Sequence, residues 1–348
     1  MKRFYKKKRV LVTGNTGFKG TWLCKSLLQM GADVMGYSLY PPTDPSVFSI
    51  LQLQKDMLWK EGDVRDLGLM QAVFNEFQPE IVLHLAAQPI VREAYRNPVH
   101  TYETNIMGTV NICECIRNTD CVRSFVNVTT DKVYENENYA KPFKEDMPLD
   151  GHDPYSNSKS CSELVTHSYT KSFFGDKEVT VSTARAGNVI GGGDFAKDRI
   201  IPDCVRAATS QQDIILRNPH SVRPYQHVLE PLYAYLMIAM EQYQNPDKQG
   251  CYNVGPDDDG CITTGELADL FCKYWGDNLK WVNQYDGGPY EAGFLRLDRT
   301  KLKDTFCWHP KWNVEQAVAK TVEWYKAYYN HENIEGIMNR QIGEMFDV

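Results

Sequence analysis

The sequence predicts an α/β fold, a doubly wound parallel sheet followed by a smaller, mixed α/β C-terminal domain. Short apolar runs alternate with helix-like stretches over residues 1–187, which is typical of a parallel sheet covered on both faces. A glycine-rich turn lies between the first apolar run and the first helix. Beyond residue 187 the alternation weakens and Gly191–Gly193 interrupt the chain, so we place the second domain at 188–348. We expect residues 223–256 to return to the first domain.

Length and composition agree with two globular domains, or with one large domain that carries an elaboration. The chain has 348 residues, and a domain takes about 150. Hydrophobic residues make up 42% and charged residues 24%, a mixture that excludes disordered, collagen-like and coiled-coil chains. The net charge of -7 argues against a nucleic-acid partner, which would need a basic surface.

Targeting and metal signals are weak. The basic start Met1–Arg9 resembles the beginning of a signal peptide, but the apolar run Val10–Val12 is far shorter than a signal-peptide core of roughly 7–15 residues. No stretch approaches the roughly 18 apolar residues of a membrane helix, so no membrane partner is expected. The ten cysteines are scattered without a C-x-x-C pair, which favours reduced thiols, a cytoplasmic location and no metal site.

Local patterns predict the elements in order. Arg9–Thr13 is a short apolar run that stops at glycine, as a buried strand does. Phe18–Met30 has apolar residues at helical spacing, and Gly31 is suited to cap its end. The further predicted strands are Asp33–Ser38, Met57–Glu61, Glu80–Leu85, Ser124–Val128 and Val179–Arg185, and the further predicted helices are Asp66–Phe77, Val99–Arg117, Asp153–Phe173 and Asn313–Tyr329.

The turn after the first strand (residues 13–20, here the glycine turn) reads TGNTGFKG, with the spacing G-x-x-G-x-x-G. Gly14 permits a tight turn, Gly17 lets backbone approach a pyrophosphate, and Gly20 allows close packing of helix on sheet. The helix that follows offers free N–H groups and a positive dipole end. Because the turn joins a strand to a helix, it predicts a dinucleotide site of the Rossmann type; a purely structural turn is the alternative.

Residues at the ends of the next two strands bear on the choice of dinucleotide. Asp63 is placed to accept a hydrogen bond from an adenine amino group, or else to cap a loop or helix. Ser38 ends the second strand, where an acid would bind the ribose hydroxyls of NAD and a basic residue would favour the 2′-phosphate of NADP. Neither type is present, so these residues leave NAD and NADP open.

The segment DPYSNSK, residues 153–159, carries the clearest catalytic signal. Asp153 suits the N-cap of a helix and Pro154 its first position. Tyr155 and Lys159 are then four residues apart and share one helix face. A nearby ammonium and the positive helix end favour the phenolate of a tyrosine, whose ordinary pKa is about 10. The pair predicts a general base that takes a hydroxyl proton while hydride leaves the same carbon.

The glycine turn and the Tyr-x-x-x-Lys pair resemble the extended short-chain dehydrogenase/reductase superfamily. Its members combine a Rossmann domain with a smaller domain for a nucleotide-sugar. The segment Val128–Tyr134 narrows the resemblance, because sugar-nucleotide 4,6-dehydratases carry Thr-Asp-Glu where this chain carries Thr130-Asp131-Lys132. With lysine at this position, the segment resembles that of the dehydratases that act on CDP-glucose. Other segments that agree are Tyr40–Phe48, His84–Arg92, Arg185–Asp194 and Arg223–Pro231.

The resemblance implies dehydration of CDP-glucose with NAD as cofactor, in deoxysugar biosynthesis. Tyr155 would take the proton of the carbon 4 hydroxyl as NAD takes the hydride, water would leave across carbons 5 and 6, and the hydride would return to carbon 6. Thr130 would hydrogen-bond the carbon 4 oxygen, and Asp131 would be the acid at carbon 6. Lys132 stands at the place of the glutamate base. As a neutral amine Lys132 would be the base, and as a cation it would stabilise the negative charge of the enolate. The alternative is that Lys132 is an ordinary solvated loop lysine without a role in the reaction.

The resemblance also implies binding residues and an assembly. Gln88 and Arg92 are expected at the sugar, and Asn188 and Arg223 at the diphosphate with Arg199 beside them. The expected cofactor residues are Gly14, Asn15, Gly17, Phe18, Lys19, Gly20, Asp63, Val64, Leu85, Ala86, Ala87, Asn105, Tyr155 and Lys159. The helices at Val99–Arg117 and Tyr155–Phe173 are expected to form a four-helix interface in a homodimer, unless one chain covers their apolar faces.

Other functions stay open on the sequence alone. A nucleotide-sugar 4-epimerase needs only the Tyr155/Lys159 pair and rotation of the keto sugar, and Asp131-Lys132 argues against it. A 4,6-dehydratase for another nucleotide-sugar is a further alternative, because the loops that recognise the base cannot be identified. A non-catalytic dinucleotide sensor has no need of Tyr155.

Overall fold

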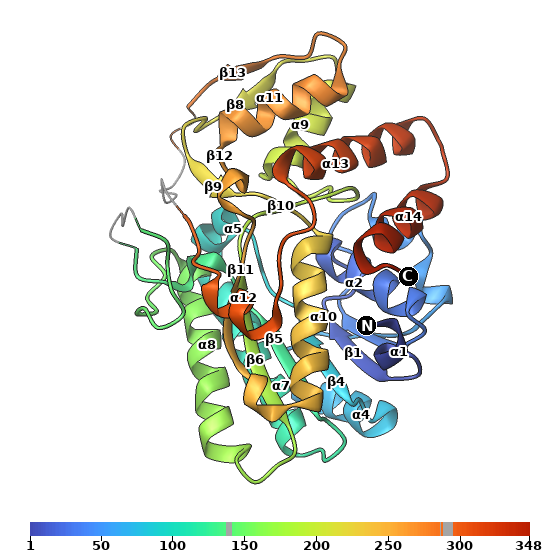
Figure 1. The fold of residues 1–348 in the computed structure, drawn as a ribbon, viewed down its shortest axis with the longest axis vertical. Coiled ribbons are helices and arrows are strands. Elements are labelled where there is room, and N and C mark those ends of the chain that lie inside the picture. Colours follow the sequence, from blue (N-terminus) through green and yellow to red (C-terminus); the bar gives the residue numbers. More distant parts are fainter. Residues whose placement is uncertain (137–140, 286, 288–294) are drawn as a thin grey trace.

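The computed structural model describes residues 1–136, 141–285, 287 and 295–348. Its centre is a seven-stranded sheet in the order β11-β6-β5-β4-β1-β2-β3, in which every neighbouring pair is parallel (Figure 1). The strands of this sheet are β1 (Arg9–Thr13), β2 (Asp33–Ser38), β3 (Leu58–Glu61), β4 (Ile81–His84), β5 (Ser124–Val128), β6 (Thr180–Ala186) and β11 (Gly250–Val254). The predicted α/β fold with a doubly wound parallel sheet is confirmed.

Helices cover both faces of the sheet, and the side chains of β1 show why both are needed. Val10 and Val12 lie in one hydrophobic core, whereas Leu11 between them lies in a second core on the opposite face. Successive strand side chains point to opposite faces, so an all-apolar strand needs a covering layer on each. The covering helices are α2 (Phe18–Gln29) and α10 (Leu229–Gln244) over the first core, and α4 (Leu67–Phe77) and α7 (Gly108–Arg117) over the second.

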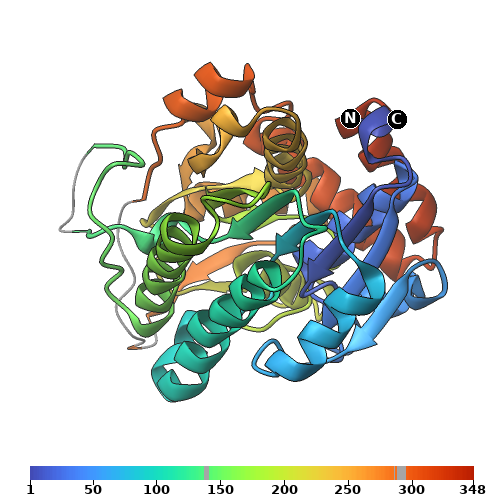
Figure 2. The ribbon, with the colours of Figure 1, turned by 90° about the horizontal axis from the view of Figure 1, so that it is seen from below.

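The helix predicted at Val99–Arg117 is interrupted. It consists of α6 (Pro98–Tyr102), the π-helical turn η2 (Glu103–Met107) and α7. Such turns insert a residue into a helix and redirect the side chains around it. Here the redirected residue is Asn105, which is buried against the loop after β4. Figure 2 shows α7 beside α8 (Pro154–Phe173), and the two helices are in contact.

Residues beyond β6 form smaller ladders and helices, most of them above the sheet in Figure 1. The ladders pair β7 with β10, β9 with β12, and β8 with β13. The predicted helix Asn313–Tyr329 is observed as α13, with Asn313 as its capping residue. The elements of this part are β7 (Val189–Ile190), α9 (Ile200–Thr209), β8 (Ile214–Leu216), β9 (Val222–Pro224), β10 (Gln226–His227), η4 (Pro246–Lys248), η5 (Asp258–Gly260), β12 (Cys261–Thr263), α11 (Thr264–Trp275), β13 (Trp281–Asn283), α12 (Thr300–Phe306), α13 (Val314–Tyr329) and α14 (Ile334–Phe346).

The remaining elements are short and lie in the first half of the chain. The N-terminal α1 lies near the C-terminus in both views (Figures 1 and 2). Over the described ranges, none of the helices has the length and apolar character that a membrane span requires. These short elements are α1 (Lys2–Tyr5), α3 (Val47–Ile50), η1 (Leu53–Lys55), α5 (Val91–Arg96) and η3 (Asp131–Val133).

Candidate active site

A large cavity opens at the carboxyl ends of the parallel strands. Its volume is about 1550 Å³; residues that follow β1 to β6 line one side, and residues from 215–225 line the other. Ligands of doubly wound sheets bind at this edge, where the strand order reverses between β1 and β4. All the predicted site residues except Asn15 and Asn105 line this cavity.

Close backbone contacts hold the glycine turn. Gly14 has a φ of +72°, and a Cβ there would lie 2.8 Å from Ala86 N. A Cβ on Gly20 would lie 2.1 Å from Gly14 O, so the turn and α2 fit together only without that side chain. A Cβ on Gly17 would meet only Gly14 O, at 3.4 Å, and would otherwise take up space beside the cavity. This space at the N-terminus of α2 fits the pyrophosphate of a dinucleotide.

Side chains near the glycine turn mostly bond to other protein groups. Asn15 is fully buried, and its Oδ1 accepts a hydrogen bond from Ser38 Oγ at 2.8 Å. Arg65 holds the Asp63 carboxylate through contacts of 2.7 to 3.1 Å, and this guanidinium holds the pKa of Asp63 below its ordinary value. Asn15 therefore ties the glycine turn to the end of β2, while Asp63 and Val64 remain on the cavity wall.

Asn105 organises the loop after β4. Its Oδ1 accepts a hydrogen bond from the Gln88 N–H at 2.8 Å, and its Nδ2 donates to Ser158 Oγ on α8 at 2.8 Å. The side chain of Gln88 is also used within the protein, because its Nε2 donates to Thr101 Oγ1 at 2.8 Å. These contacts make Asn105 a positioning residue for the cavity wall, and the π-helical turn η2 is the local reason that it reaches there.

The start of α8 brings Tyr155 and Lys159 to the cavity, on one face of the helix. Asp153 Oδ1 accepts hydrogen bonds from the backbone N–H groups of Tyr155 and Ser156, both at 3.0 Å, and so caps the helix as predicted. Lys159 Nζ donates to the carbonyl oxygen of Val128 at 3.1 Å, and burial lowers the pKa of Lys159 to about 8.

The electrostatics of Tyr155 differ from the prediction. Burial raises the pKa of Tyr155 to about 12, although a hydrogen bond with Thr130 and the charge of Arg199 both act to lower it. The prediction named positive charges that favour the phenolate, and burial, which it did not include, outweighs the charge of Arg199 here. Tyr155 is nevertheless partly exposed, since its ring faces the cavity.

The segment Thr130-Asp131-Lys132 lies directly beyond β5. Lys132 Nζ donates to Asp131 Oδ1 at 3.0 Å and to Asn188 Oδ1 at 3.5 Å. Thr130 Oγ1 donates to the same Asp131 oxygen at 3.1 Å, while the buried Asp131 Oδ2 has no hydrogen-bond partner in the described ranges. This contact with a carboxylate favours the charge-stabilising alternative for Lys132 over the base.

The residues predicted to bind the nucleotide-sugar line the same cavity from several elements. Arg92 lies on α5, Asn188 between β6 and β7, and Arg223 on β9. Arg199, just before α9, forms an ion pair of 2.8 Å with Asp194. No sequence pattern marked Asp194 as its partner, since the pairing depends on how the loop between β7 and α9 folds back.

A buried ion pair fixes the middle of α8, and sequence reasoning missed it. Glu163 Oε2 accepts hydrogen bonds from Thr183 at 2.7 Å and from Arg185 at 2.9 Å, both on β6. Its other oxygen accepts from Thr129 at 2.5 Å. The available signal was that Glu163 lies one turn beyond Lys159. These contacts fix α8 against the sheet and so position the helix start at the cavity.

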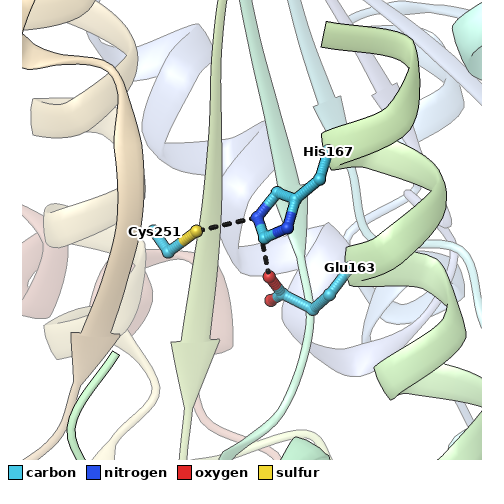
Figure 3. Close-up of side chains that lie close together, drawn as sticks. All are labelled: Glu163, His167 and Cys251. Carbon is cyan, nitrogen blue, oxygen red and sulfur yellow. Dashed lines mark hydrogen bonds and ion pairs between the residues drawn. The ribbon is translucent and has the colours of Figure 1, made fainter. Parts of the chain in front are cut away.

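Figure 3 shows Glu163 with His167 and Cys251, a group that no sequence spacing revealed. His167 Nε2 lies 2.9 Å from Cys251 Sγ and 3.8 Å from Glu163 Oε2. Burial raises the pKa of the Cys251 thiol and lowers the pKa of His167, so the pair is a neutral hydrogen bond. Because the Glu163 carboxylate is already bound by a guanidinium, the group does not fit a metal ion.

The strand order, the glycine turn and the capped start of α8 define an extended short-chain dehydrogenase/reductase. A model of the GDP-mannose 4,6 dehydratase family matches residues 11–321. The chain belongs to this family, and the predicted resemblance is confirmed.

Individual relatives agree with this family assignment. The CDP-glucose 4,6-dehydratase of Salmonella typhimurium is 43% identical, over 99% of this chain and 97% of that protein. Among solved structures, a UDP-glucose 4-epimerase with UDP-glucose from Thermotoga maritima has a TM-score of 0.81 at 23% identity, over 92% of this chain and 99% of that one. A dTDP-glucose 4,6-dehydratase from Bacillus anthracis, in complex with NAD, has a TM-score of 0.78 at 22% identity, over 93% of this chain and 98% of that one. At such identities the two structures bear on the fold alone.

Proposed function

We propose that this protein is a CDP-glucose 4,6-dehydratase, a hydro-lyase that converts CDP-D-glucose to CDP-4-keto-6-deoxy-D-glucose and water. The observation that carries the proposal is that Asp131 and Lys132 share one cavity with Tyr155. An epimerase needs only the Tyr155/Lys159 pair, whereas elimination of water needs an acid and a stabilised enolate as well. The 43% identity to the Salmonella enzyme of this name supports the choice of substrate.

The glycine turn supports NAD as the cofactor, because its backbone leaves room for a pyrophosphate at the N-terminus of α2. NAD, when bound, supplies a nicotinamide that accepts the hydride of carbon 4 and later returns it to carbon 6. Gly14, Gly17 and Gly20 would hold the pyrophosphate, with Phe18 and Lys19 contributing backbone N–H groups. Asp63 and Val64 would line the adenine end, and Leu85, Ala86 and Ala87 the ribose and pyrophosphate.

In this proposal Tyr155 takes the proton of the carbon 4 hydroxyl. Its burial opposes the phenolate, so the positive charges near it have to be in place when it acts; Arg199 supplies one of them. Lys159, held on the Val128 carbonyl, keeps a second positive charge on the same face of α8. Thr130 would hydrogen-bond the carbon 4 oxygen, because it already hydrogen-bonds Tyr155.

The elimination is assigned to the segment beyond β5. Asp131 would give a proton to the carbon 6 hydroxyl as it leaves, which agrees with the unpartnered Asp131 Oδ2 in the described part of the chain. Lys132 would stabilise the negative charge of the enolate through its ammonium. Arg92, Asn188 and Arg223, which all line the cavity, would bind the nucleotide-sugar.

We also propose the two-domain division at residue 187, the return of 223–256 to the first domain, and a homodimer. The dimer is supported by large apolar side chains exposed along α5 to α8, among them Val99 (67% exposed) and Leu164 (54% exposed). Sedimentation measurements of the oligomeric state of the variant Leu164→Asp test the proposed dimer. The control is Leu58→Asp on the edge strand β3. We expect dissociation of the first variant alone. The ten free cysteines support a reducing compartment such as the cytoplasm.

Mass spectrometry of CDP-glucose incubated with enzyme and NAD in deuterated water tests the reaction. We expect loss of one water, one solvent deuteron in the sugar and no net reduction of NAD. An unchanged chemical formula would contradict the proposal and indicate epimerisation or another substrate. Parallel reactions with UDP-, dTDP- and GDP-sugars separate these two outcomes.

A further inference from the structure

Two short segments of the chain carry the groups that the proposed reaction needs. Thr130, Asp131 and Lys132 follow β5, whereas Tyr155 and Lys159 lie at the start of α8. All five residues line the cavity, so they have to act on one sugar from two separate elements. Hydrogen bonds from α8 to the residues on each side of the segment 130–132 hold the two elements together.

Two of these bonds go to backbone carbonyls. Lys159 Nζ donates to the carbonyl oxygen of Val128 at 3.1 Å. Ser160 Oγ, on the next residue of the helix, donates to the carbonyl oxygen of Val133 at 2.7 Å. The segment 130–132 therefore lies between two carbonyls that are both bonded to α8.

The third bond goes to Glu163, which shares one face of α8 with Tyr155 and Lys159 because the three residues are spaced by four. Thr129 Oγ1 donates to Glu163 Oε1 at 2.5 Å, and Thr129 directly precedes Thr130. One helix face thus carries the proposed base, the ammonium next to it, and the acceptor that holds the start of the segment 130–132.

Glu163 is itself fixed from the sheet. Its Oε2 accepts hydrogen bonds from Thr183 Oγ1 at 2.7 Å and from Arg185 Nη2 at 2.9 Å, both on β6. The carboxylate and the guanidinium are both buried. A buried ion pair contributes little net stability, because desolvation of the two charges opposes their attraction. What this pair supplies is the direction of its hydrogen bonds.

The same ion pair also reaches the residue beyond η3. Arg185 Nη1 donates to the Tyr134 hydroxyl at 2.9 Å, and Tyr134 directly follows η3. The Tyr134 hydroxyl in turn donates to Asn253 Oδ1 on β11 at 2.6 Å. The pair of Glu163 and Arg185 therefore connects both sides of the segment 130–132 with α8 and with two strands of the sheet.

We propose that Glu163 is a positioning residue for the dehydration and that it acts through the hydroxyl of Thr129. This inference rests on the proposed function. The bond sets where Thr130 and Asp131 lie relative to Tyr155, so that one sugar meets the base and the acid together. Glu163 is fully buried and so does not touch the substrate. Without the bond the segment would shift, and a displacement of about 1 Å lowers a rate by about 10²-fold.

The test removes one hydroxyl. Removal of Glu163 itself would leave Arg185 as an unpaired buried cation, which is strongly destabilising. Thr129→Val instead deletes the bond to Glu163 and leaves the ion pair in place. Thr183→Val is the matched control, because it deletes a buried bond to the same carboxylate from a residue outside the segment 130–132. Thr129→Ser keeps the hydroxyl and should rescue the activity.

Steady-state turnover of CDP-glucose by the NAD-loaded enzymes is compared. In Thr129→Val we expect kcat to fall by about 10- to 100-fold, with KM for CDP-glucose within about threefold of the wild type. In Thr183→Val and Thr129→Ser we expect kcat within about threefold of the wild type, because the bond from residue 129 remains. Denaturant unfolding should show similar losses of stability in the two valine variants, since each loses one buried hydrogen bond to Glu163.

Equal losses of kcat in the two valine variants would overturn the proposal, because activity would then follow stability alone. A kcat of Thr129→Val within about threefold of the wild type would overturn it too, as would a failure of Thr129→Ser to restore kcat. A raised KM with unchanged kcat in Thr129→Val would instead assign Thr129 to substrate binding and overturn the positioning role. A wild type that removes no water from CDP-glucose overturns the proposed function, whereas the variant results bear on Glu163 alone.

Discussion

The two ends of the cavity are built differently. At the dinucleotide end, backbone makes the surface, and polar side chains such as Asn15 and Asn105 bond to other protein groups. At the catalytic end, charged side chains make the surface, and Asp131 Oδ2 has no hydrogen-bond partner in the described ranges. The dinucleotide end selects by shape, although the buried Asn15 Nδ2 has no hydrogen-bond partner in the described ranges. The other is electrostatically unbalanced, and that imbalance is available for moving protons.

The strongest test of this contrast removes one oxygen from the catalytic end. Tyr155→Phe should lower the rate of dehydration by about 10²- to 10⁴-fold, because it removes the proposed base. It should leave bound NAD unchanged, because the glycine turn is untouched. Product mass and the absorbance of protein-bound NAD measure the two effects. Tyr169→Phe, on the same helix and hydrogen-bonded to Glu114 at 2.6 Å, is the control and should keep full activity. Full turnover by Tyr155→Phe would exclude the proposed base.

The second test adds one carbon to the dinucleotide end. Gly20→Ala places a Cβ 2.1 Å from Gly14 O and 2.8 Å from Asn15 Cα, so backbone has to move. We expect NAD affinity to fall by about 5- to 160-fold, since overpacking costs about 1–3 kcal/mol. Equilibrium dialysis with NAD measures it. Gly68→Ala in α4 is the matched control, because its Cβ would lie at an ordinary 3.6 Å from Asp66 Oδ1. Equal NAD binding by both variants would mean that shape does not govern this end.

The third test asks whether Asn105 is structural, as the contrast requires. Asn105→Ala leaves the buried Gln88 N–H without its acceptor, which should cost about 1–3 kcal/mol of unfolding free energy. Denaturant unfolding measures this, with exposed Asn75→Ala as the control. A loss of NAD binding with unchanged stability would instead assign Asn105 to the cofactor.

The smallest expected effect concerns buried imidazoles outside the catalytic end. Burial lowers the pKa of both His84 and His227 to about 3, so both are neutral in the folded protein. The unfolded chain binds protons at these residues below its ordinary pKa of about 6.5, so stability is lost as the pH falls. Each should cost about 0.7 kcal/mol between pH 7 and pH 6. Denaturant unfolding at the two pH values measures the loss, and His227→Asn should halve it. If His227→Asn lost as much stability between the two pH values as the wild type, the imidazole of His227 would be protonated in the folded wild type.

Local patterns predicted six of the seven strands of the central sheet, but neither β11 nor the ladders outside the sheet. The run Arg9–Thr13 and the capped start of α8 depend on neighbouring residues, and both were predicted. By contrast, β8 pairs with β13, which lies far along the sequence, and neither strand has more than three residues. The π-helical turn in the helix predicted at Val99–Arg117 was also missed, because no local pattern indicates the tertiary contacts that Asn105 makes from it.

The candidate active site shows the same division between features that local patterns predict and features that depend on tertiary contacts. Tyr155, Lys159 and Asp131 belong to motifs that can be read in the sequence, and the cavity brings them together. The effect of burial on the pKa of Tyr155 was not predicted, because the degree of burial does not follow from spacing. The position of Lys19 beside Arg199 depends on how α2 and the segment before α9 meet across the cavity, and no local pattern carries that information.

The strand order determines when, during synthesis on the ribosome, each strand of the sheet can pair with its neighbours. The strand β6 is complete once residue 186 has emerged, but its neighbour β11 spans 250–254. Until those residues leave the exit tunnel, β6 is an unprotected sheet edge with open backbone hydrogen-bonding groups. A nascent chain paused in this interval is exposed to edge-to-edge association with its neighbours on the same polysome. Chaperone demand during translation should therefore be highest while the segment between these two strands is being made.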